Sequence, residues 1–387
     1  MKKLLELTTQ QEYEKNSDEK DIIDVVEDFD YKTQSDEYNI EYKKWRSDKN
    51  NPYAYNYIKN KKERVFTDGY GYVESSQDSA RRKVIARIGL HIGWALIIFF
   101  VLQTFIPNVL ILILRLFGVD VSKSFFLDYI FGNQTAVAFI KITETIVKYL
   151  IPTFFLCHSF KLPDKIAIPL HFKDKKELFT GISMMFTVQP VLFAINLWIR
   201  SIFSTFDYAS EQRVFSEFSI TSVPIIFYFA FSLLGIPLLN EFFIHASSLH
   251  VLRQFGDWFA IISTAIFSVI IEQESFSIIG TFVMSVIIGM FVLRSGTIFM
   301  GIIMRFIYTS FTGTAFILLK LGMTKQIVIL CIVSGIAGII GLFASKNNTF
   351  KNVKLVNNDG VPYKQKFIPL FTSPTIIFAI FCSLILG

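Results

Sequence analysis

Two ionisable side chains stand four residues apart in an otherwise apolar stretch of this sequence. Glu241 and His245 lie in the run 235–245, which reads Gly-Ile-Pro-Leu-Leu-Asn-Glu-Phe-Phe-Ile-His. On a helix, residues i and i+4 lie on the same face, so this carboxylate and imidazole can share a proton, a metal ion or a partner group. Ionisable groups inside a membrane are costly and usually mark a function. The spacing therefore predicts a catalytic or binding site at Glu241 and His245.

A third ionisable residue, Arg305, lies near the middle of a later apolar segment. An arginine at that depth costs at least ~2.5–3.5 kcal/mol by insertion scales and should face an internal acid. We therefore predict a buried ion pair between Arg305 and Glu241. The alternative is a divalent-metal site made by Glu241, His245 and Glu272. Glu272 falls at the predicted end of its helix, which disfavours that alternative, so we predict no metal.

These residues belong to a chain that is too apolar for a soluble protein of its size. Of its 387 residues 52% are hydrophobic, and the mean hydropathy is +0.46. The apolar runs are continuous rather than alternating, which favours transmembrane helices over a β-barrel. We predict an all-α, polytopic transmembrane helical bundle of eight or nine spans. They lie at about 85–117, 136–159, 177–203, 220–248, 257–272, 276–294, 297–319, 325–345 and 370–386.

A polar arm, residues 1–80, precedes the first span. Residues 12–41 carry twelve acids and three lysines, and residues 43–64 carry eight basic residues and two acids. This composition predicts a mostly disordered arm with one or two short helices. The alternative is a docking arm whose acidic half folds back on basic loops, or whose tyrosines bind a partner.

Basic residues at the start of the first span predict the orientation of the chain. Arg81, Arg82, Lys83 and Arg87 precede the apolar run, and the positive-inside rule then places the N-terminus in the cytoplasm of a plasma-membrane protein. The net charge of +6 comes from Lys and Arg at segment ends, so we expect membrane lipid and not nucleic acid as a partner. The cysteines, at 157, 331 and 382, lack metal-ligand spacing and are interpreted as packing residues.

Three further polar positions are interpreted as structural. His91 is expected to be a packing histidine near a membrane interface, and His250 to be accommodated by water and a helix C-terminus. Lys141, Glu144 and Lys148 repeat at helical spacing, which favours ion pairing along one face and leaves a polar cavity lining as the alternative.

The features that follow Glu241 occur in a specific order. A basic loop at 252–258, an apolar helix ending at Glu272, and the segments 288–298 and 303–309 come in turn. This order and spacing resemble the CPBP family of intramembrane proteases, which includes the type II CaaX prenyl proteases and bacterial relatives linked to immunity functions. The resemblance covers about residues 220–320. It suggests four parts: the 1–80 arm, N-terminal transmembrane helices at 85–219, the 220–320 core, and C-terminal helices with a cytoplasmic loop at 321–387.

The family's first motif is a glutamate pair followed after three residues by an arginine. Here it falls on Asn240, Glu241 and His245. The resemblance therefore implies that the first glutamate, which would activate water, has been replaced by Asn240.

The other two motifs also differ in this chain. A phenylalanine and a histidine separated by three residues fall on Phe267 and Ile271. A histidine and an asparagine with the same separation fall on Arg305 and Thr309, so the histidines and the oxyanion-stabilising amide are absent.

These replacements favour a bacterial membrane pseudoenzyme over an enzyme. Its function would be binding of a protein or peptide partner, in immunity, regulation or scaffolding, with no cofactor. The first alternative is an active CaaX-type intramembrane metalloendopeptidase that uses Glu241 and His245, and only that alternative requires zinc. The second alternative is a transporter-like membrane protein.

Overall fold

The part of the chain that the structure describes is helical apart from two short hairpins, and this confirms the predicted fold class. The computed structural model describes residues 34–48, 50–55, 65–67, 71–73, 76–124, 130–169, 175–216, 223–272, 278–345 and 362–386. The helices are α2 (Asp36–Ser47), α3 (Ser76–Leu116), α4 (Gln134–Ser159), α5 (Asp164–Ala167), α6 (Lys175–Ser216), α7 (Val223–Glu241), the π-helix η1 (Phe242–Leu249), α8 (His250–Arg253), α9 (Asp257–Ile271), α10 (Ile278–Ser295), α11 (Ile298–Lys320), α12 (Thr324–Ala344), α13 (Tyr363–Phe371) and α14 (Pro374–Leu386). Strand β1 (Val65–Thr67) pairs antiparallel with β2 (Gly71–Val73), and β3 (Val121–Lys123) pairs antiparallel with β4 (Ile130–Gly132).

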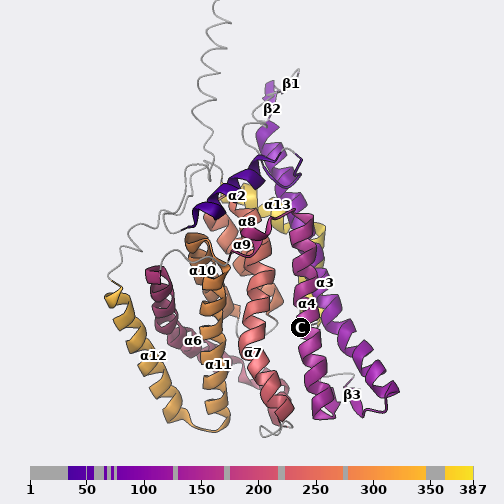
Figure 1. The fold of residues 1–387 in the computed structure, drawn as a ribbon, viewed down its shortest axis with the longest axis vertical. Coiled ribbons are helices and arrows are strands. Elements are labelled where there is room, and N and C mark those ends of the chain that lie inside the picture. Colours follow the sequence, from indigo (N-terminus) through magenta and orange to yellow (C-terminus); the bar gives the residue numbers. More distant parts are fainter. Residues whose placement is uncertain are drawn as a thin grey trace, which may run out of the picture.

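The long helices run side by side as a bundle. In Figure 1, α3 and α4 form one side, α6 and α12 the other, and α7, α10 and α11 lie between them. The last helix, α14, packs on the first long helix, α3, although they stand at opposite ends of the sequence. Short elements α2, α8 and α13 gather at one end of the bundle, which we call the α2 end.

Close approach between the helices depends on small residues. A Cβ atom at Gly93 of α3 would lie 2.6 Å from the backbone nitrogen of Ile376 in α14. At Gly338 of α12 it would lie 2.5 Å from the backbone nitrogen of Thr187 in α6. Glycine at these positions lets two backbones meet, which is a common device of helix packing in membranes.

Six helical segments are long and apolar enough to cross a membrane, or seven if the bent pair α13 and α14 forms one span. Our predicted count of eight or nine also included the segments that form α4 and α9. Helix α4 has 26 residues but carries Lys141, Glu144 and Lys148, whereas α9 has only 15 residues. By length and composition alone, the described helices therefore support a lower count than the sequence suggested.

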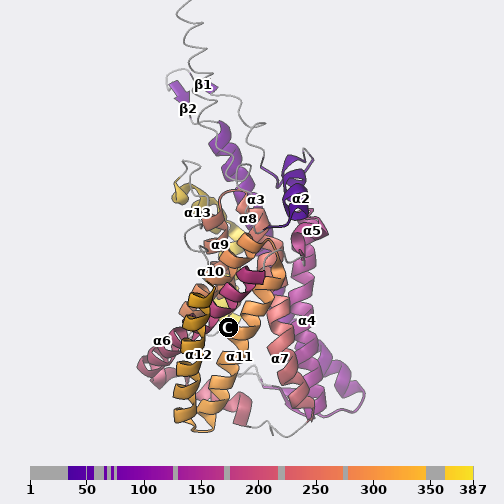
Figure 2. The same ribbon diagram turned by 60° about the vertical axis from the view of Figure 1, so that its left-hand side comes forward.

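Part of the predicted arm packs on the bundle. Residues 34–48 and 50–55, which we call the strap, contain α2 and lie across the α2 end, above α5 and the end of α4 (Figure 2). The short helix expected in the arm is thus present in α2. The strap has no core of its own, but it buries Tyr38, Tyr42 and Trp45 against the bundle. The disorder predicted for residues 1–33 and 56–64 concerns segments that lie outside the described residues.

Candidate functional site

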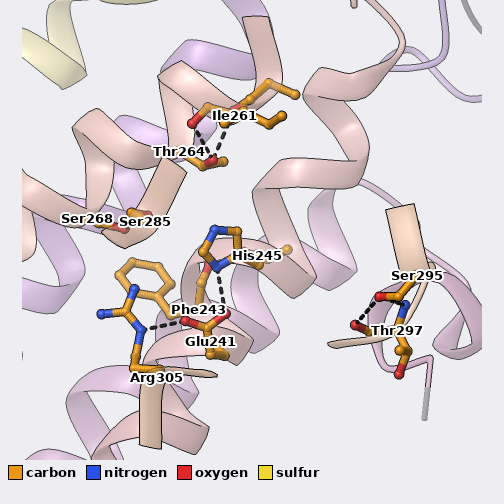
Figure 3. Close-up of polar contacts among 12 residues, drawn as sticks. Glu241, Phe243, His245, Ile261, Thr264, Ser268, Ser285, Ser295, Thr297 and Arg305 are labelled. Carbon is orange, nitrogen blue, oxygen red and sulfur yellow. Dashed lines mark hydrogen bonds and ion pairs between the residues drawn. The ribbon is translucent and has the colours of Figure 1, made fainter. Parts of the chain in front are cut away.

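Glu241 and Arg305 meet inside the bundle. Glu241 is the last residue of α7, and Arg305 lies in the first half of α11. The Arg305 Nε donates a hydrogen bond to Glu241 Oε1, as Figure 3 shows. The Glu241 side chain is fully buried and that of Arg305 is 5% exposed. The structure therefore brings together two charges, 64 residues apart in the sequence, that neutralise each other away from solvent.

His245 contacts the other oxygen of the same carboxylate. Its Nδ1 lies 2.7 Å from Glu241 Oε2, and the imidazole is fully buried. His245 belongs to η1, an eight-residue π-helix that directly continues α7. Such segments occur frequently at functional sites, and nothing in the hydrophobic spacing indicated this one. Both carboxylate oxygens are thus engaged by basic side chains from two different elements.

Glycines on neighbouring helices leave room for these two side chains. A Cβ atom at Gly301 of α11 would lie only 2.5 Å from Glu241 Oε2 and 2.8 Å from Cγ2 of Val292. A Cβ atom at Gly289 of α10 would lie 3.5 Å from His245 Nε2. The carboxylate is therefore enclosed by helix backbone as well as by its charged partners.

Among the remaining predicted positions only Glu272 is ionisable, and it interacts electrostatically with Arg305. Asn240 is buried beside Glu241 on α7, and Ile271 is the last residue of α9. Thr309 donates its hydroxyl hydrogen to the carbonyl of Arg305, one turn earlier in α11. Glu272 caps the C-terminal end of α9, where the sequence placed it.

The donor set does not fit a divalent cation. Arg305 already pairs with one oxygen of Glu241, and a cation at that oxygen would be repelled by the guanidinium. Among the described residues there is no group of three or more His, Cys, Asp or Glu side chains that could hold a metal ion. The Arg305 guanidinium thus occupies the side of the carboxylate that a metal ion would need.

One polar contact between helices was not anticipated from the sequence, whereas ion pairing along α4 was. The hydroxyls of Ser268 on α9 and Ser285 on α10 are 2.7 Å apart and join the two helices. On α4, Glu144 is buried and contacts both Lys141, at 3.4 Å, and Lys148, at 3.1 Å. The helical spacing had predicted only the second of these as a pair, and the contacts make the stripe a set of ion pairs.

A second buried polar cluster lies at the α2 end. His250 is fully buried, which contradicts our expectation that water accommodates it. Its Nδ1 instead shares a hydrogen bond with the hydroxyl of Tyr38, 2.7 Å away, and that hydroxyl oxygen accepts from Arg253 Nη1 at 3.2 Å. Arg253 also donates from Nε to Asp257 Oδ1 at 3.2 Å. Sequence reasoning missed this cluster because Tyr38 comes from the arm, 212 residues before His250.

Two of the strap's tyrosines, Tyr38 and Tyr42, are held in the neutral form. Burial raises the pKa of Tyr38, an effect that the nearby Arg253 opposes in part. Burial likewise raises the pKa of Tyr42 well above its usual range. Both phenols therefore stay protonated at physiological pH and can donate hydrogen bonds.

His91 has the packing role that was expected of it. Its Nε2 lies 3.0 Å from the hydroxyl of Tyr53, and its Nδ1 lies 3.0 Å from the carbonyl oxygen of Arg87. The ring also stacks on Phe155. His91 thus links the strap to α3 and α4.

Comparison with known proteins supports the resemblance over the part of the chain that holds the buried cluster. Residues 222–311 match the family model described as Type II CAAX prenyl endopeptidase Rce1-like. No curated protein and no solved structure shows a significant match to the chain. The matched segment runs from α7 into α11 and contains Glu241, His245 and Arg305. The resemblance predicted from the order of the motifs is therefore confirmed: over residues 222–311 this membrane protein is similar to the type II CAAX prenyl endopeptidases of the CPBP family.

Proposed function

We propose that this protein is a non-catalytic relative of the type II CAAX prenyl endopeptidases that acts by binding a protein or peptide partner. The observation that carries the proposal is the state of Glu241. One oxygen of its carboxylate accepts from Arg305 and the other lies against His245. Such a group is a structural counter-ion and is poorly placed to activate water.

Peptide hydrolysis places demands that this geometry does not meet. A general base must reach the attacking water with a free lone pair, and a second group must polarise the scissile carbonyl. Both oxygens of the Glu241 carboxylate are occupied by Arg305 and His245. Thr309 directs its hydroxyl to the backbone of its own helix rather than outward. The cluster therefore supports helix packing better than it supports catalysis.

The proposal includes the orientation and location expected from the sequence. Arg81, Arg82, Lys83 and Arg87 lie at the α2 end of α3, so the positive-inside rule places this end and the strap in the cytoplasm. The membrane is then the plasma membrane, and the partner is a cytoplasmic or membrane-borne protein or peptide.

The test is a proteolysis assay on the full chain, purified in detergent and supplied with Zn²⁺ and a prenylated peptide that ends in a CaaX sequence. We expect no cleavage by the wild type and less than one metal equivalent by mass spectrometry. The control variant is Glu144→Gln, which alters another buried glutamate that has basic partners. Cleavage that persists in Glu144→Gln and disappears in Glu241→Gln would overturn the proposal and establish the metalloendopeptidase alternative.

A gain-of-function experiment tests the same proposal by restoring the residues of the family motifs. The variant carries Asn240→Glu, Ile271→His, Arg305→His and Thr309→Asn, which restores the four family positions. If these replacements are what removed the activity, the variant should bind about one equivalent of Zn²⁺ that the wild type does not bind. Equal metal binding by both proteins would contradict this explanation.

A further inference from the structure

The strap satisfies backbone carbonyls at the ends of several long helices. Trp45 Nε1 donates to the carbonyl of Phe160, the C-cap of α4, at 3.1 Å. Tyr42 donates its hydroxyl hydrogen to the carbonyl of His250 at 2.9 Å, and Gln34 Nε2 donates to the carbonyl of Leu293 near the end of α10. The last carbonyls of a helix have no partner within it. The strap therefore serves as a shared cap for three parts of the bundle.

These contacts form one continuous surface beneath the strap, which we call the cradle. It consists of Phe160, Lys165, His250, Arg253, Gln254 and Leu293. Gln254 contributes a pair of contacts to the strap backbone, since its Oε1 accepts from the Tyr55 nitrogen at 2.7 Å and its Nε2 donates to the Tyr53 carbonyl at 2.9 Å. The cradle thus recognises peptide backbone as well as side chains.

The cradle is basic and the strap brings aromatic rings and an acid to it. The Arg253 guanidinium lies 5.8 Å from the ring centre of Tyr38 and 5.3 Å from that of Tyr42. At the rim, Lys165 Nζ lies 2.5 Å from Glu37 Oε1, and both of these side chains are about half exposed. Cation–π contacts and an acid–base pair make the match specific in charge and in shape.

The strap depends on the cradle for its structure. Helix α2 has 12 residues, a length at which isolated helices are marginal in water. One face carries Tyr38, Tyr42 and Trp45 into the bundle, while Ile40, on another face, is 64% exposed. Most of the polar contacts end on carbonyls, which water can hydrate when the strap leaves. This segment is therefore held by contacts that another molecule can replace.

We infer that the strap is a built-in occupant of the surface that binds the partner. We expect the partner to resemble the strap chemically. It is a helical segment with aromatic hydrogen-bond donors at positions i, i+4 and i+7, like Tyr38, Tyr42 and Trp45, and with an acidic residue just before the first of them. A partner of this kind binds when the strap is displaced. The cradle and the buried cluster share one continuous helical stretch, because His250 directly follows η1, which holds His245. This inference rests on the partner-binding part of the proposed function, but its test uses neither metal nor proteolysis.

The experiment measures binding of a fluorescent synthetic peptide, residues 34–55, to the full chain by anisotropy. In the wild type the resident strap competes, so binding should be weak. Tyr42→Ala with Trp45→Ala in the chain removes two contacts of the resident strap and should tighten peptide binding by at least about tenfold, since each lost hydrogen bond contributes about 1 kcal/mol. A peptide with the same two substitutions is the matched control and should not bind.

A locked strap provides the second measurement. Glu37→Cys and Lys165→Cys, joined by a flexible bis-maleimide, hold the strap in place on the Tyr42→Ala, Trp45→Ala background, and this cross-link should abolish peptide binding. The same reagent on a chain without the two new cysteines controls for the native thiols. If the double alanine chain does not fold, Tyr42→Phe removes only the hydroxyl and should still tighten binding several-fold. Equal binding to the wild type and the strap variants, or binding unaffected by the cross-link, would overturn the inference.

Discussion

The two buried polar clusters use similar residues but are completed in different ways. Each contains an arginine, an acid and a histidine: Glu241, His245 and Arg305 inside the bundle, and His250, Arg253 and Asp257 at the α2 end, where Tyr38 joins them. The inner cluster is completed by the bundle helices themselves. The outer cluster is covered by a segment from the arm.

This difference separates a structural ion pair from a replaceable contact. If Arg305 is lost, Glu241 is left with His245, which is itself buried, and an uncompensated buried charge is expensive. If the strap leaves, Arg253 keeps Asp257 and gains water. We therefore expect the inner cluster to govern the stability of the fold and the outer cluster to govern what binds at its end.

Arg305→Met should have the largest effect. It leaves the Glu241 carboxylate buried without its guanidinium, which typically costs about 3–5 kcal/mol of stability. Thermal unfolding of the detergent-purified chain measures this loss. The double variant Glu241→Gln, Arg305→Met should recover most of it, because replacing a whole buried pair by uncharged groups is often nearly neutral. A comparable loss in Tyr38→Phe, which removes only the strap hydroxyl from the outer cluster, would break the distinction between the two clusters.

Gly301→Ala should have an intermediate effect. The added Cβ would lie 2.5 Å from Glu241 Oε2, so the carboxylate or its helix must shift, at a cost of about 1–3 kcal/mol. Gly335→Ala in α12 is the control, since no heavy atom lies within 4 Å of its Cβ position. We expect the control to unfold within a few degrees of the wild type. Equal unfolding temperatures for both variants would show that the carboxylate is less tightly enclosed than described here.

High pH should release the strap with a smaller effect on the bundle. Burial raises the pKa of Tyr38 and of Tyr42 above the ordinary value of 10.0. Below pH 10 both phenols are protonated whether the strap is docked or free, so docking does not depend on their titration. Above pH 10 the free strap ionises first, and docking weakens by up to about 1.4 kcal/mol per pH unit for each tyrosine.

The fluorescence of Trp45 reports this release. Subtracting the spectrum of Trp45→Phe isolates its emission, which should shift to longer wavelength above pH 10 as the indole leaves its buried position. A Tyr42→Phe chain should show a weaker pH dependence. An emission maximum that stays constant to pH 11 would contradict the raised pKa values.

Most of the helical framework could be predicted because each span carries a long apolar signal of its own. All the predicted spans coincide with helices, although α4 and α9 are too polar or too short to count as candidate spans. The pairing of Glu241 with Arg305 could also be predicted from the sequence, since a charge buried within the membrane needs a counter-charge. The match over residues 222–311 covers the same helices.

The π-helix η1 could not be predicted, whereas docking of the arm was expected only as the alternative to disorder, in which its acidic half folds back on basic loops, as Glu37 does on Lys165. The π-helix η1 has the same apolar composition as an α-helix, so hydrophobic spacing does not distinguish the two. The docking of the strap depends on contacts across more than 200 residues, such as that of Tyr42 with His250. The charge blocks of the arm predicted disorder because a polar segment cannot bury enough surface by itself, whereas the strap shares the core of the bundle.

The strap also imposes an order on biosynthesis. Gln34 leaves the ribosome before any of the spans described here, yet the carbonyl that it contacts, that of Leu293, is made 259 residues later. Until α10 has been inserted, the aromatic face of α2 has no complete surface to cover it. During translation the strap must therefore remain exposed to water or be bound by another protein. Its docking completes the α2 end of the bundle.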